Sequence, residues 1–377
     1  MPTNPFDVEY YESRAKHKKH EIRGEYFRDQ TAIIHSMPFR RLKHKTQVFF
    51  APQNDHVCTR IEHVMHVASI AATICRGLNN NNPDNWKLDM ELAYTIGLGH
   101  DIGHAPFGHA GETALSYKLP VNTTFMHELN SLRVVDKLAN EGNGLNLTYA
   151  VRDGIVCHNG EQFEKSIKPN KYKVDLDTIT NRKYYPSTYE GCIVRFSDKI
   201  AYLGRDIEDA IVAGFISITD VDEDLRSDLG ESNGEIINTL IKDLITSSQD
   251  GEEICFSEEK HELILRLKDF NYKTIYNNSA IINYKRFGTR IIYNLFDYLC
   301  SLYCELGQDY DKYLHKERLK IDNYFGNYLK KMKIFYVEES FIPQQIVTDY
   351  ISGMTDDFAL KCMEEISIPK PMEFQRK

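Results

Sequence analysis

Features that define several large classes of proteins are missing from this 377-residue chain. No apolar run approaches the ~18 residues that a helix needs to cross a membrane. The charged N-terminal stretch MPTNPFDVEYYESRAKHKKH has no apolar core of the kind that signal peptides carry. The Gly-rich phosphate loops of P-loop and Rossmann proteins and the nucleophile elbow of α/β hydrolases are also absent from the sequence. We therefore expect a soluble, cytoplasmic protein without membrane contact.

Paired cysteines and an excess of basic residues are missing as well. Eight cysteines are scattered, and the closest pair, Cys300 and Cys304, lacks CxxC spacing, which indicates reduced intracellular thiols rather than a disulfide framework. The formal net charge of -9 argues against broad nucleic-acid binding, which usually requires a basic face. Only the Lys-rich segment 165–173 favours single-stranded nucleic acid as a partner. A local basic pocket for a phosphorylated small molecule is compatible with this charge.

What the sequence does contain is helical periodicity. Apolar residues recur at three- and four-residue spacing, the pattern of helices with one buried face. Helices are predicted at about 57–78, 90–98, 124–138, 190–213 and through much of 236–368. The polar segment 161–189 is predicted as a long loop or insertion, with a lid as one interpretation, and the acidic segment 220–235 as a linker. The predicted fold is all-α, with an N-terminal arm and helix at 1–50, a catalytic core at 51–219 and a C-terminal helical subdomain at 220–377 that supplies oligomer contacts.

The densest group of titratable side chains lies in GLGHDIGHAPFGHAGE, residues 97–112. Three histidines and two carboxylates stand there among glycines and a proline, a poor composition for a packed core. His100 and Asp101 follow a predicted buried helix and project about 100° apart, so both can meet one ion over their shared edge. A His-Asp dipeptide alone is usually structural, and the density of titratable groups is what favours a functional site here.

Two other predicted helices carry residues of the same kinds. On helix 57–78, His63 shares a stripe with Arg60, and a ligand role and a satisfied core position are equally open for this histidine. On helix 190–213, Asp198 stands in an apolar run, where an aspartate is seldom buried without a partner or a metal.

These residues together predict phosphate chemistry with a metal. Two imidazoles and two carboxylates suit one divalent cation and leave positions for water and substrate. Arg60, Lys199 and the basic stretch 40–45 are candidates for neutralising phosphate oxygens, although a solvated face is the alternative for the basic stretch. From the residues alone we predict a metal-dependent phosphohydrolase. The predicted ligands are His63, His100, Asp101 and Asp198.

The same residues lie in blocks that resemble a known family, the HD-domain phosphohydrolases, and among them the deoxynucleoside triphosphate triphosphohydrolases (dGTPase-like proteins). The family pattern H…HD…D matches the four predicted ligands. The likeness covers most of the chain, because further blocks stand in the order of the family: FRDQTAIIHSMPFRRLKHKTQVF, TRIEHVMHVA, GHDIGHAPFGHAGE, FMHELNSLRVV, CIVRFSDKIAYLGRDIEDA and YISGMTDDFA.

The resemblance implies a mostly helical HD-domain fold and hydrolysis of dGTP or other dNTPs to a deoxynucleoside and inorganic triphosphate. Water attacks the α-phosphorus in that reaction, and the enzyme is a hydrolase of triphosphoric monoesters. A divalent cation is implied, with Mn or Mg ahead of Fe, Co or Ni. The resemblance also implies a homo-oligomer, a tetramer or a hexamer, and an activating nucleotide in some members. The base preference stays open.

Position in the family motifs gives individual residues expected roles. A histidine suits proton transfer because its ordinary pKa lies near the operating pH. His109 is the expected proton carrier, with Glu112 as its carboxylate partner. His104 is expected nearest the α-phosphate, and His127 is expected as a further active-site histidine. Arg60 and Lys199 match triphosphate contacts. The expected readers of the sugar 3′-hydroxyl are Gln47, Tyr202 and Asp206, and the tyrosine would crowd a 2′-hydroxyl.

Two departures from the family pattern bear on the surroundings of the predicted ligands. His66 stands where many relatives carry glutamate, and Glu128-Leu129 stands where many carry asparagine and a small residue.

Two other functions are alternatives to the dNTP triphosphohydrolase. The first is another HD-type nucleotide phosphohydrolase, a monophosphatase or a phosphodiesterase. The second is a dNTP-sensing or nucleic-acid-binding protein.

Overall fold

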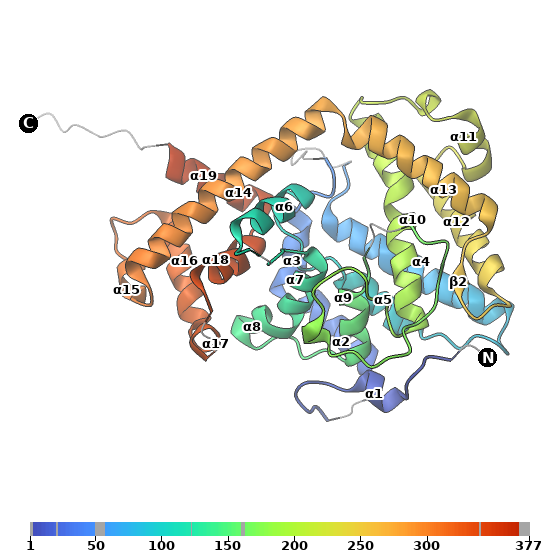
Figure 1. Cartoon of the computed structure of the whole chain (residues 1–377), viewed down its shortest axis with the longest axis horizontal. Coiled ribbons are helices and arrows are strands. Elements are labelled where there is room, and N and C mark those ends of the chain that lie inside the picture. The colour runs from blue at the N-terminus through green and yellow to red at the C-terminus, as the bar shows by residue number, and fades with distance from the viewer. Residues whose placement is uncertain are drawn as a thin grey trace, which may run out of the picture. The chain divides into compact units, whose positions relative to one another are not determined.

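The computed structural model describes residues 3–19, 22–49, 57–121, 123–159, 163–338 and 341–368. These residues are mostly helical, which confirms the predicted all-α class (Figure 1). The one small sheet among them joins β1 (Ser166–Ile167) to β2 (Ile254–Cys255), antiparallel and with Ser166 opposite Cys255. No helix in these described ranges is both long and apolar enough to cross a membrane. All eight cysteines are free.

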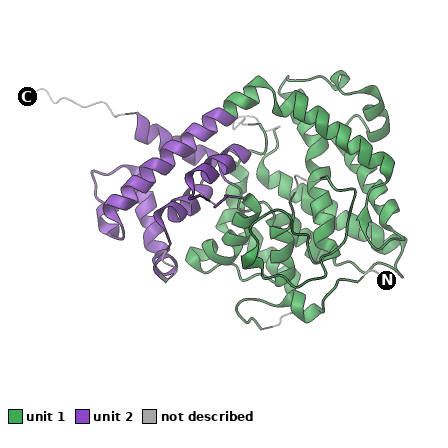
Figure 2. Ribbon diagram, viewed as in Figure 1, with its two compact units in different colours: residues 1–104, 126–284 green, residues 105–125, 285–377 purple. Residues whose placement is uncertain are grey.

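The chain forms two compact units (Figure 2). The first consists of residues 1–104 and 126–284, and the second of residues 105–125 and 285–377. The boundary between them falls within α14 (Ser279–Leu306), whereas the predicted limit at 219–220 lies inside the first unit. The division into an arm, a core and a C-terminal subdomain stays a prediction about functional segments.

The first unit is organised around α4 (Arg60–Asn81), which packs against α5 (Met90–Gly99) and α10 (Tyr189–Val212). Where α4 and α5 meet, a Cβ on Gly97 would lie 2.6 Å from the Cα of Ala68, so only glycine allows this approach. The other elements of the unit are α1 (Val8–Glu12), α2 (Glu25–His35), α3 (Met37–Arg41), η1 (Leu42–His44), α7 (His127–Arg133), η2 (Val134–Leu138), α8 (Ala139–Gly142), α9 (Tyr149–Val156), η3 (Leu176–Thr178), η4 (Ile218–Asp220), α11 (Glu223–Leu229), α12 (Asn233–Ser248), α13 (Glu258–Asn271) and η5 (Tyr272–Tyr276).

Local sequence explains where the central helices begin. Thr59 and Glu62 form a capping box at the start of α4, and the side chain of Asp89 accepts two backbone N–H bonds at the start of α5. At the start of α10, the hydroxyl of Thr188 accepts from the backbone N–H of Gly191. These helices match the predictions to within a few residues. The helix predicted at 124–138 starts later, as α7, and its last five residues form the π-helical turn η2.

Two segments differ from simple loops. The predicted linker 220–235 was wrong in part, because it contains α11, which buries Leu225 and Leu229 and packs against α12. Two leucines four residues apart give this acidic helix one apolar face. The predicted loop at 161–189 is mostly irregular where it is described, but it holds β1 and η3 and buries Ile167 and Leu176.

The second unit is a helical assembly rich in aromatic contacts. The ring of Phe325, which is fully buried, lies near Tyr313 and Tyr350, with centroids 6.0 and 4.9 Å away. Edge-to-face and tilted pairs of this kind add stability beyond the area that they bury. With the second unit's part of α14, its elements are α6 (His109–Lys118), α15 (Tyr310–Tyr313), α16 (Lys320–Lys331), α17 (Lys333–Glu338), α18 (Pro343–Ser352) and α19 (Asp356–Ser367).

Candidate metal centre and active site

The three central helices of the first unit bring the four predicted ligands together. His63 lies on α4, His100 caps the C-terminus of α5 with Asp101 directly after it, and Asp198 lies on α10. All four side chains are buried. Asp198 Oδ1 is 3.0 Å from His63 Nε2 and 3.9 Å from His100 Nε2, and Asp101 Oδ1 is 3.9 Å from the same His100 nitrogen.

His63, His100 and Asp198 offer ligand atoms that all lie within 4.8 Å of one another, whereas Asp101 forms such a group with His100 and His158. The first group fits a divalent cation, and Asp101 adjoins it through His100. Ligand atoms at about 2.1 Å from one ion lie roughly 3–4 Å from each other, the range that the three distances span. His100 Nδ1 donates to the carbonyl of Gly97 at 2.7 Å, so the lone pair is on Nε2. That Nε2 atom is buried and has no hydrogen-bond partner among the described residues. A buried nitrogen with a lone pair and no partner is what a metal ligand requires.

The electrostatics keep these ligands in the states that bind metals. Burial lowers the pKa of His100 to about 4, although Asp101 opposes that shift, so the imidazole is neutral at pH 7. Burial alone would raise the pKa of Asp101, but Arg60 and the surrounding imidazoles outweigh it and hold that pKa well below its usual range. Burial would also raise the pKa of Asp198, but the hydrogen bond with His63 and the nearby imidazoles outweigh burial and lower that pKa.

Arg60 was predicted to contact a triphosphate, and in this structure it is paired with Asp101, one of the predicted metal ligands. Its Nη1 atom donates to Asp101 Oδ2, and Nη2 donates to the carbonyl of Thr46 at 3.2 Å. The Nε atom is buried without a partner among the described residues. The guanidinium therefore holds one oxygen of Asp101 and leaves the other on the side of His100.

Beside the ligands lies a row of imidazoles. His104 stacks on His127, with centroids 4.5 Å apart and planes at 16°. His127 Nε2 is 3.8 Å from Asp101 Oδ1 and 3.3 Å from Nε2 of His158. His158 Nδ1 donates to the carbonyl of Ile155 at 2.6 Å, so its Nε2 accepts and His127 Nε2 donates. Both His104 and His127 thus lie close to the predicted ligands.

The unusual Glu128 holds the other side of His127. Its Oε2 lies 3.6 Å from His127 Nδ1, and its Oε1 accepts from Arg182 Nε at 2.7 Å. Burial would raise the pKa of Glu128, but the neighbouring His127 and His158 and the bond from Arg182 lower it. An ionised carboxylate therefore faces one nitrogen of His127, and the lone pair of His158 faces the other.

The cations of the basic stretch 40–45 differ in exposure. Arg40, Arg41 and Lys43 are exposed, as a solvated face requires. Lys45 is buried, and its ammonium donates to the carbonyl of His104. This single lysine ties the stretch to the row of imidazoles.

Two of the three expected sugar readers share α10, one turn apart. Asp206 is buried, and Oδ2 of its carboxylate accepts from the hydroxyl of Tyr276 on η5. Burial raises the pKa of Asp206 to about 7. Tyr202 is half-buried, and Gln47 follows η1 with a buried Oε1 atom that has no hydrogen-bond partner among the described residues.

Lys199, the other expected triphosphate contact, is engaged in an ion pair. Its Nζ atom lies 2.6 Å from Oε2 of Glu164, whose Oε1 accepts from Arg195. Both cations are almost completely buried. Burial lowers the pKa of Lys199 to about 8, and Glu164 opposes the fall. Glu164 lies in the segment predicted as a lid and binds the start of that segment to α10.

The expected proton carrier and its partner belong to the second unit. His109 begins α6, and its Nδ1 lies 3.5 Å from Oε2 of Glu112, three residues along the helix. The side chain of His109 is 64% exposed and that of Glu112 is 9% exposed. The pair thus has a buried carboxylate behind an imidazole that solvent reaches.

Sequence reasoning missed three residues: His158, Glu164 and Tyr276. His158 follows a buried helix and precedes Asn-Gly, and this position is only a weak sequence signal for a functional residue. Its contact with His127 becomes visible only in the folded structure. Glu164 and Tyr276 stand in segments without periodic or spacing signals.

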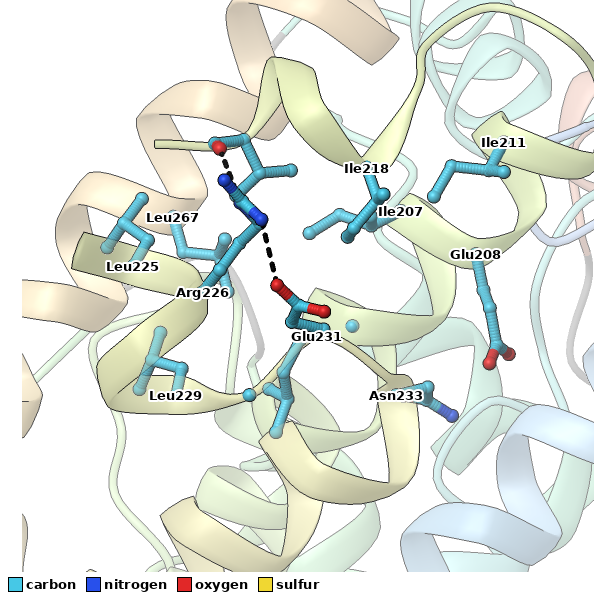
Figure 3. A pocket seen from close by; sticks show the side chains of 14 residues that line it. Ile207, Glu208, Ile211, Ile218, Leu225, Arg226, Leu229, Glu231, Asn233 and Leu267 are labelled. Carbon is cyan, nitrogen blue, oxygen red and sulfur yellow. Dashed lines mark hydrogen bonds and ion pairs between the residues drawn. The ribbon is translucent and has the colours of Figure 1, made fainter. Parts of the chain in front are cut away.

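A separate hollow of about 360 Å³, including its open part, lies beside the C-terminal half of α10. It is lined mainly by apolar residues of α10, α11 and α12, with the Arg226–Glu231 ion pair among the lining side chains (Figure 3). None of the predicted ligands lines it.

The chain is similar to known proteins over most of its length. The model of the HD domain matches residues 60–203, a range that includes all four predicted ligands. A protein of Caldanaerobacter subterraneus subsp. tengcongensis named deoxyguanosinetriphosphate triphosphohydrolase-like protein is 36% identical over 98% of this chain and 93% of its own. Proteins of the same name from Desulfatibacillum aliphaticivorans and Clostridium tetani are 37% and 34% identical, over 93% and 94% of this chain and 90% and 89% of theirs.

Proposed function

Because the chain belongs to the family of HD-domain deoxyguanosinetriphosphate triphosphohydrolase-like proteins, we propose that it is a metal-dependent dNTP triphosphohydrolase. The products would be a deoxynucleoside and intact inorganic triphosphate. The observation that carries the proposal is the convergence of His63, His100, Asp101 and Asp198, with the unpartnered lone pair of His100 Nε2 among them.

These four residues would hold one divalent cation, which we propose to be Mn or Mg. When bound, such an ion polarises a phosphoryl oxygen and makes a bound water more acidic. The protein's contribution is the protonation state of the ligands: His100 neutral and both aspartates ionised. Arg60 keeps Asp101 ionised and in one orientation.

The histidines beside the ligands would orient the phosphate nearest the sugar. In this structure His127 Nε2 donates to His158, and this N–H would turn to a phosphate oxygen when substrate binds, while the carboxylate of Glu128 faces the Nδ1 atom of this ring. His104 stacks on it and would contact the same phosphate. We assign proton transfer to the leaving 5′-oxygen to His109 Nε2, with Glu112 holding its Nδ1 side.

Lys199 would contact the triphosphate, and Gln47, Tyr202 and Asp206 would read the sugar. The ion pair with Glu164 keeps Lys199 charged in a buried position, and a triphosphate can replace or share that carboxylate partner. Asp206 is suited to bind a sugar hydroxyl because Tyr276 already holds one of its oxygens. A cytoplasmic location, a homo-oligomer and an activating nucleotide remain part of the same proposal.

Chromatographic product analysis tests this function. Each dNTP is incubated with the purified protein and Mn or Mg, with and without EDTA, and dNTP mixtures follow in case an activator is required. We expect deoxynucleoside and intact triphosphate, abolished by EDTA and by His100→Gln, and retained by the control His35→Gln at an exposed position. Pyrophosphate or orthophosphate as the first product, or hydrolysis of dNMPs or cyclic dinucleotides alone, would contradict the proposal.

A further inference from the structure

The loop that leads into α6 has an unusual backbone. Phe107 has a φ of 63° and Gly108 a φ of 59°. A bulky residue with positive φ is an outlier, and such a conformation persists only where its surroundings hold it. His109 follows at once, so the conformation of these two residues sets where the first turn of α6 places its imidazole.

One buried carboxylate holds this conformation. Oδ1 of Asp356 accepts a hydrogen bond from the backbone N–H of Phe107 at 3.0 Å, and Asp356 is 2% exposed. The aspartate comes from the block YISGMTDDFA, 249 residues further along the chain and within the same compact unit.

Helix capping does not explain why Asp356 is there. Thr355 is the N-cap of α19, and its hydroxyl accepts from the N–H of Phe358. Asp357 stands in the same first turn and also benefits from the helix dipole. Asp356 is thus not the cap of its own helix, and its carboxylate also accepts from the backbone of Phe107.

Two glycines also allow other parts of the second unit to pack closely against this loop. A Cβ on Gly288 of α14 would lie 2.8 Å from the Cβ of Phe107, and a Cβ on Gly111 would lie 1.9 Å from the carbonyl oxygen of Pro106. Neither distance leaves room for a methyl group without a shift of the loop. Gly288, Gly111 and Asp356 thus hold residues 106–107 from three elements of the second unit.

We propose that Asp356 is a positioning residue for the pair His109–Glu112. It fixes the backbone of Phe107 and thereby the direction in which His109 leaves the start of α6. The proposal deepens the proposed function and rests on it for the catalytic role of His109. An error of about 1 Å in the position of a catalytic group can cost about a hundredfold in rate.

The test uses the full-length chain and two independent measurements. Hydrogen exchange of the peptide that contains Phe107 reports the anchoring without any need for activity. Steady-state kinetics on a dNTP that the wild type consumes reports the consequence. The variants are Asp356→Ala, which removes the acceptor, Asp356→Asn, which keeps an Oδ1 acceptor, and the matched control Asp357→Ala in the same helix turn.

In Asp356→Ala we expect faster exchange at the Phe107 amide, by about tenfold or more, and a fall in kcat of at least about tenfold with KM within about twofold. Asp356→Asn should retain most of the exchange protection at Phe107 and most of kcat. Asp357→Ala should match the wild type in both measurements. Added to His109→Ala, Asp356→Ala should lower kcat no further, because both changes then act on one group. If Asp356→Ala does not fold, Gly288→Ala displaces Phe107 from the other side and should lower kcat in the same way.

Unchanged exchange at Phe107 in Asp356→Ala would overturn the anchoring. Equal effects of Asp356→Ala and Asp357→Ala, or losses that multiply in the His109→Ala background, would overturn the positioning role. A wild type that hydrolyses no dNTP would refute the proposed function, and hydrogen exchange would still decide the anchoring.

Discussion

Replacement of Glu164 by glutamine is expected to weaken dNTP binding in a way that depends on pH. Glu164 Oε2 lies 2.6 Å from Lys199 Nζ, and both side chains are largely buried. Burial lowers the pKa of Lys199 to about 8, while Glu164 acts to raise it. Without the carboxylate, the ammonium group loses its proton at a lower pH. Fewer chains then carry the charge that is proposed to bind the triphosphate.

The size of the effect follows from that titration. If the lost interaction is worth about 1.4 kcal/mol, the proton affinity of Lys199 falls about tenfold. At pH 8 its protonated share then falls from about one half to about one tenth, and at pH 6.5 from almost all to about three quarters. KM should therefore rise about fivefold at pH 8 and by less than about 1.5-fold at pH 6.5.

The assay is the ratio of KM between variant and wild type at the two pH values, since this ratio cancels the titration of the substrate itself. Glu258→Gln is the matched control, because Glu258 pairs with Lys165 but its side chain is 79% exposed. It should leave KM unchanged at both pH values. A ratio for Glu164→Gln that is the same at pH 6.5 and pH 8, or a lower KM, would refute the reasoning.

Three other substitutions probe the metal centre, the sugar site and the N-terminal arm. His100→Ala should lose bound Mn after gel filtration, as measured by elemental analysis, because the unpartnered Nε2 is gone; full metal content would count against its role as a ligand. Tyr276→Phe removes the hydroxyl that holds Asp206, a hydrogen bond worth about 0.5–1.5 kcal/mol when the carboxyl is neutral and about 1.5–3 kcal/mol when it is ionised. With the carboxyl ionised, KM for dNTPs should rise about tenfold or more, whereas KM for 2′,3′-dideoxynucleotides, which lack the 3′-hydroxyl, should change little; equal changes would exclude a role at that hydroxyl. Arg14→Ala removes the cation that lies 2.5 Å from the buried Asp29 and 2.6 Å from Glu25, which keeps the more distant Arg28 at 3.9 Å. It should cost about 3–5 kcal/mol of unfolding free energy in a urea titration, and a loss below about 1 kcal/mol would contradict the ion-pair account.

The helical fold and the place of the predicted ligands could be read from the sequence because both follow local rules. Apolar spacing marks the buried faces of α4, α5 and α10, and caps such as Thr59 and Asp89 mark their starts. Once His63 and Asp198 are on buried faces of helices that pack against α5, their meeting with His100 is a consequence of packing.

The partners of these residues could not be read in the same way. Lys199 was predicted to face a triphosphate, but the glutamate that binds it in this structure lies 35 residues away in an irregular segment. Likewise, Tyr276 meets Asp206 across 70 residues, and Asp356 meets Phe107 across 249. Such pairs depend on how the elements pack, and neither periodicity nor spacing in one sequence encodes them. The two leucines of α11 carried a local signal, which the surrounding acidic residues obscured.

Hydrolysis in water labelled with oxygen-18 tests the central claim most directly. If the centre built from His63, His100, Asp101 and Asp198 directs water to the α-phosphorus, mass spectrometry should find one labelled oxygen in the released triphosphate and none in the deoxynucleoside. Label in the deoxynucleoside would place the attack at the sugar carbon, and label in pyrophosphate or orthophosphate would place it at another phosphorus. Either result would contradict the proposed reaction.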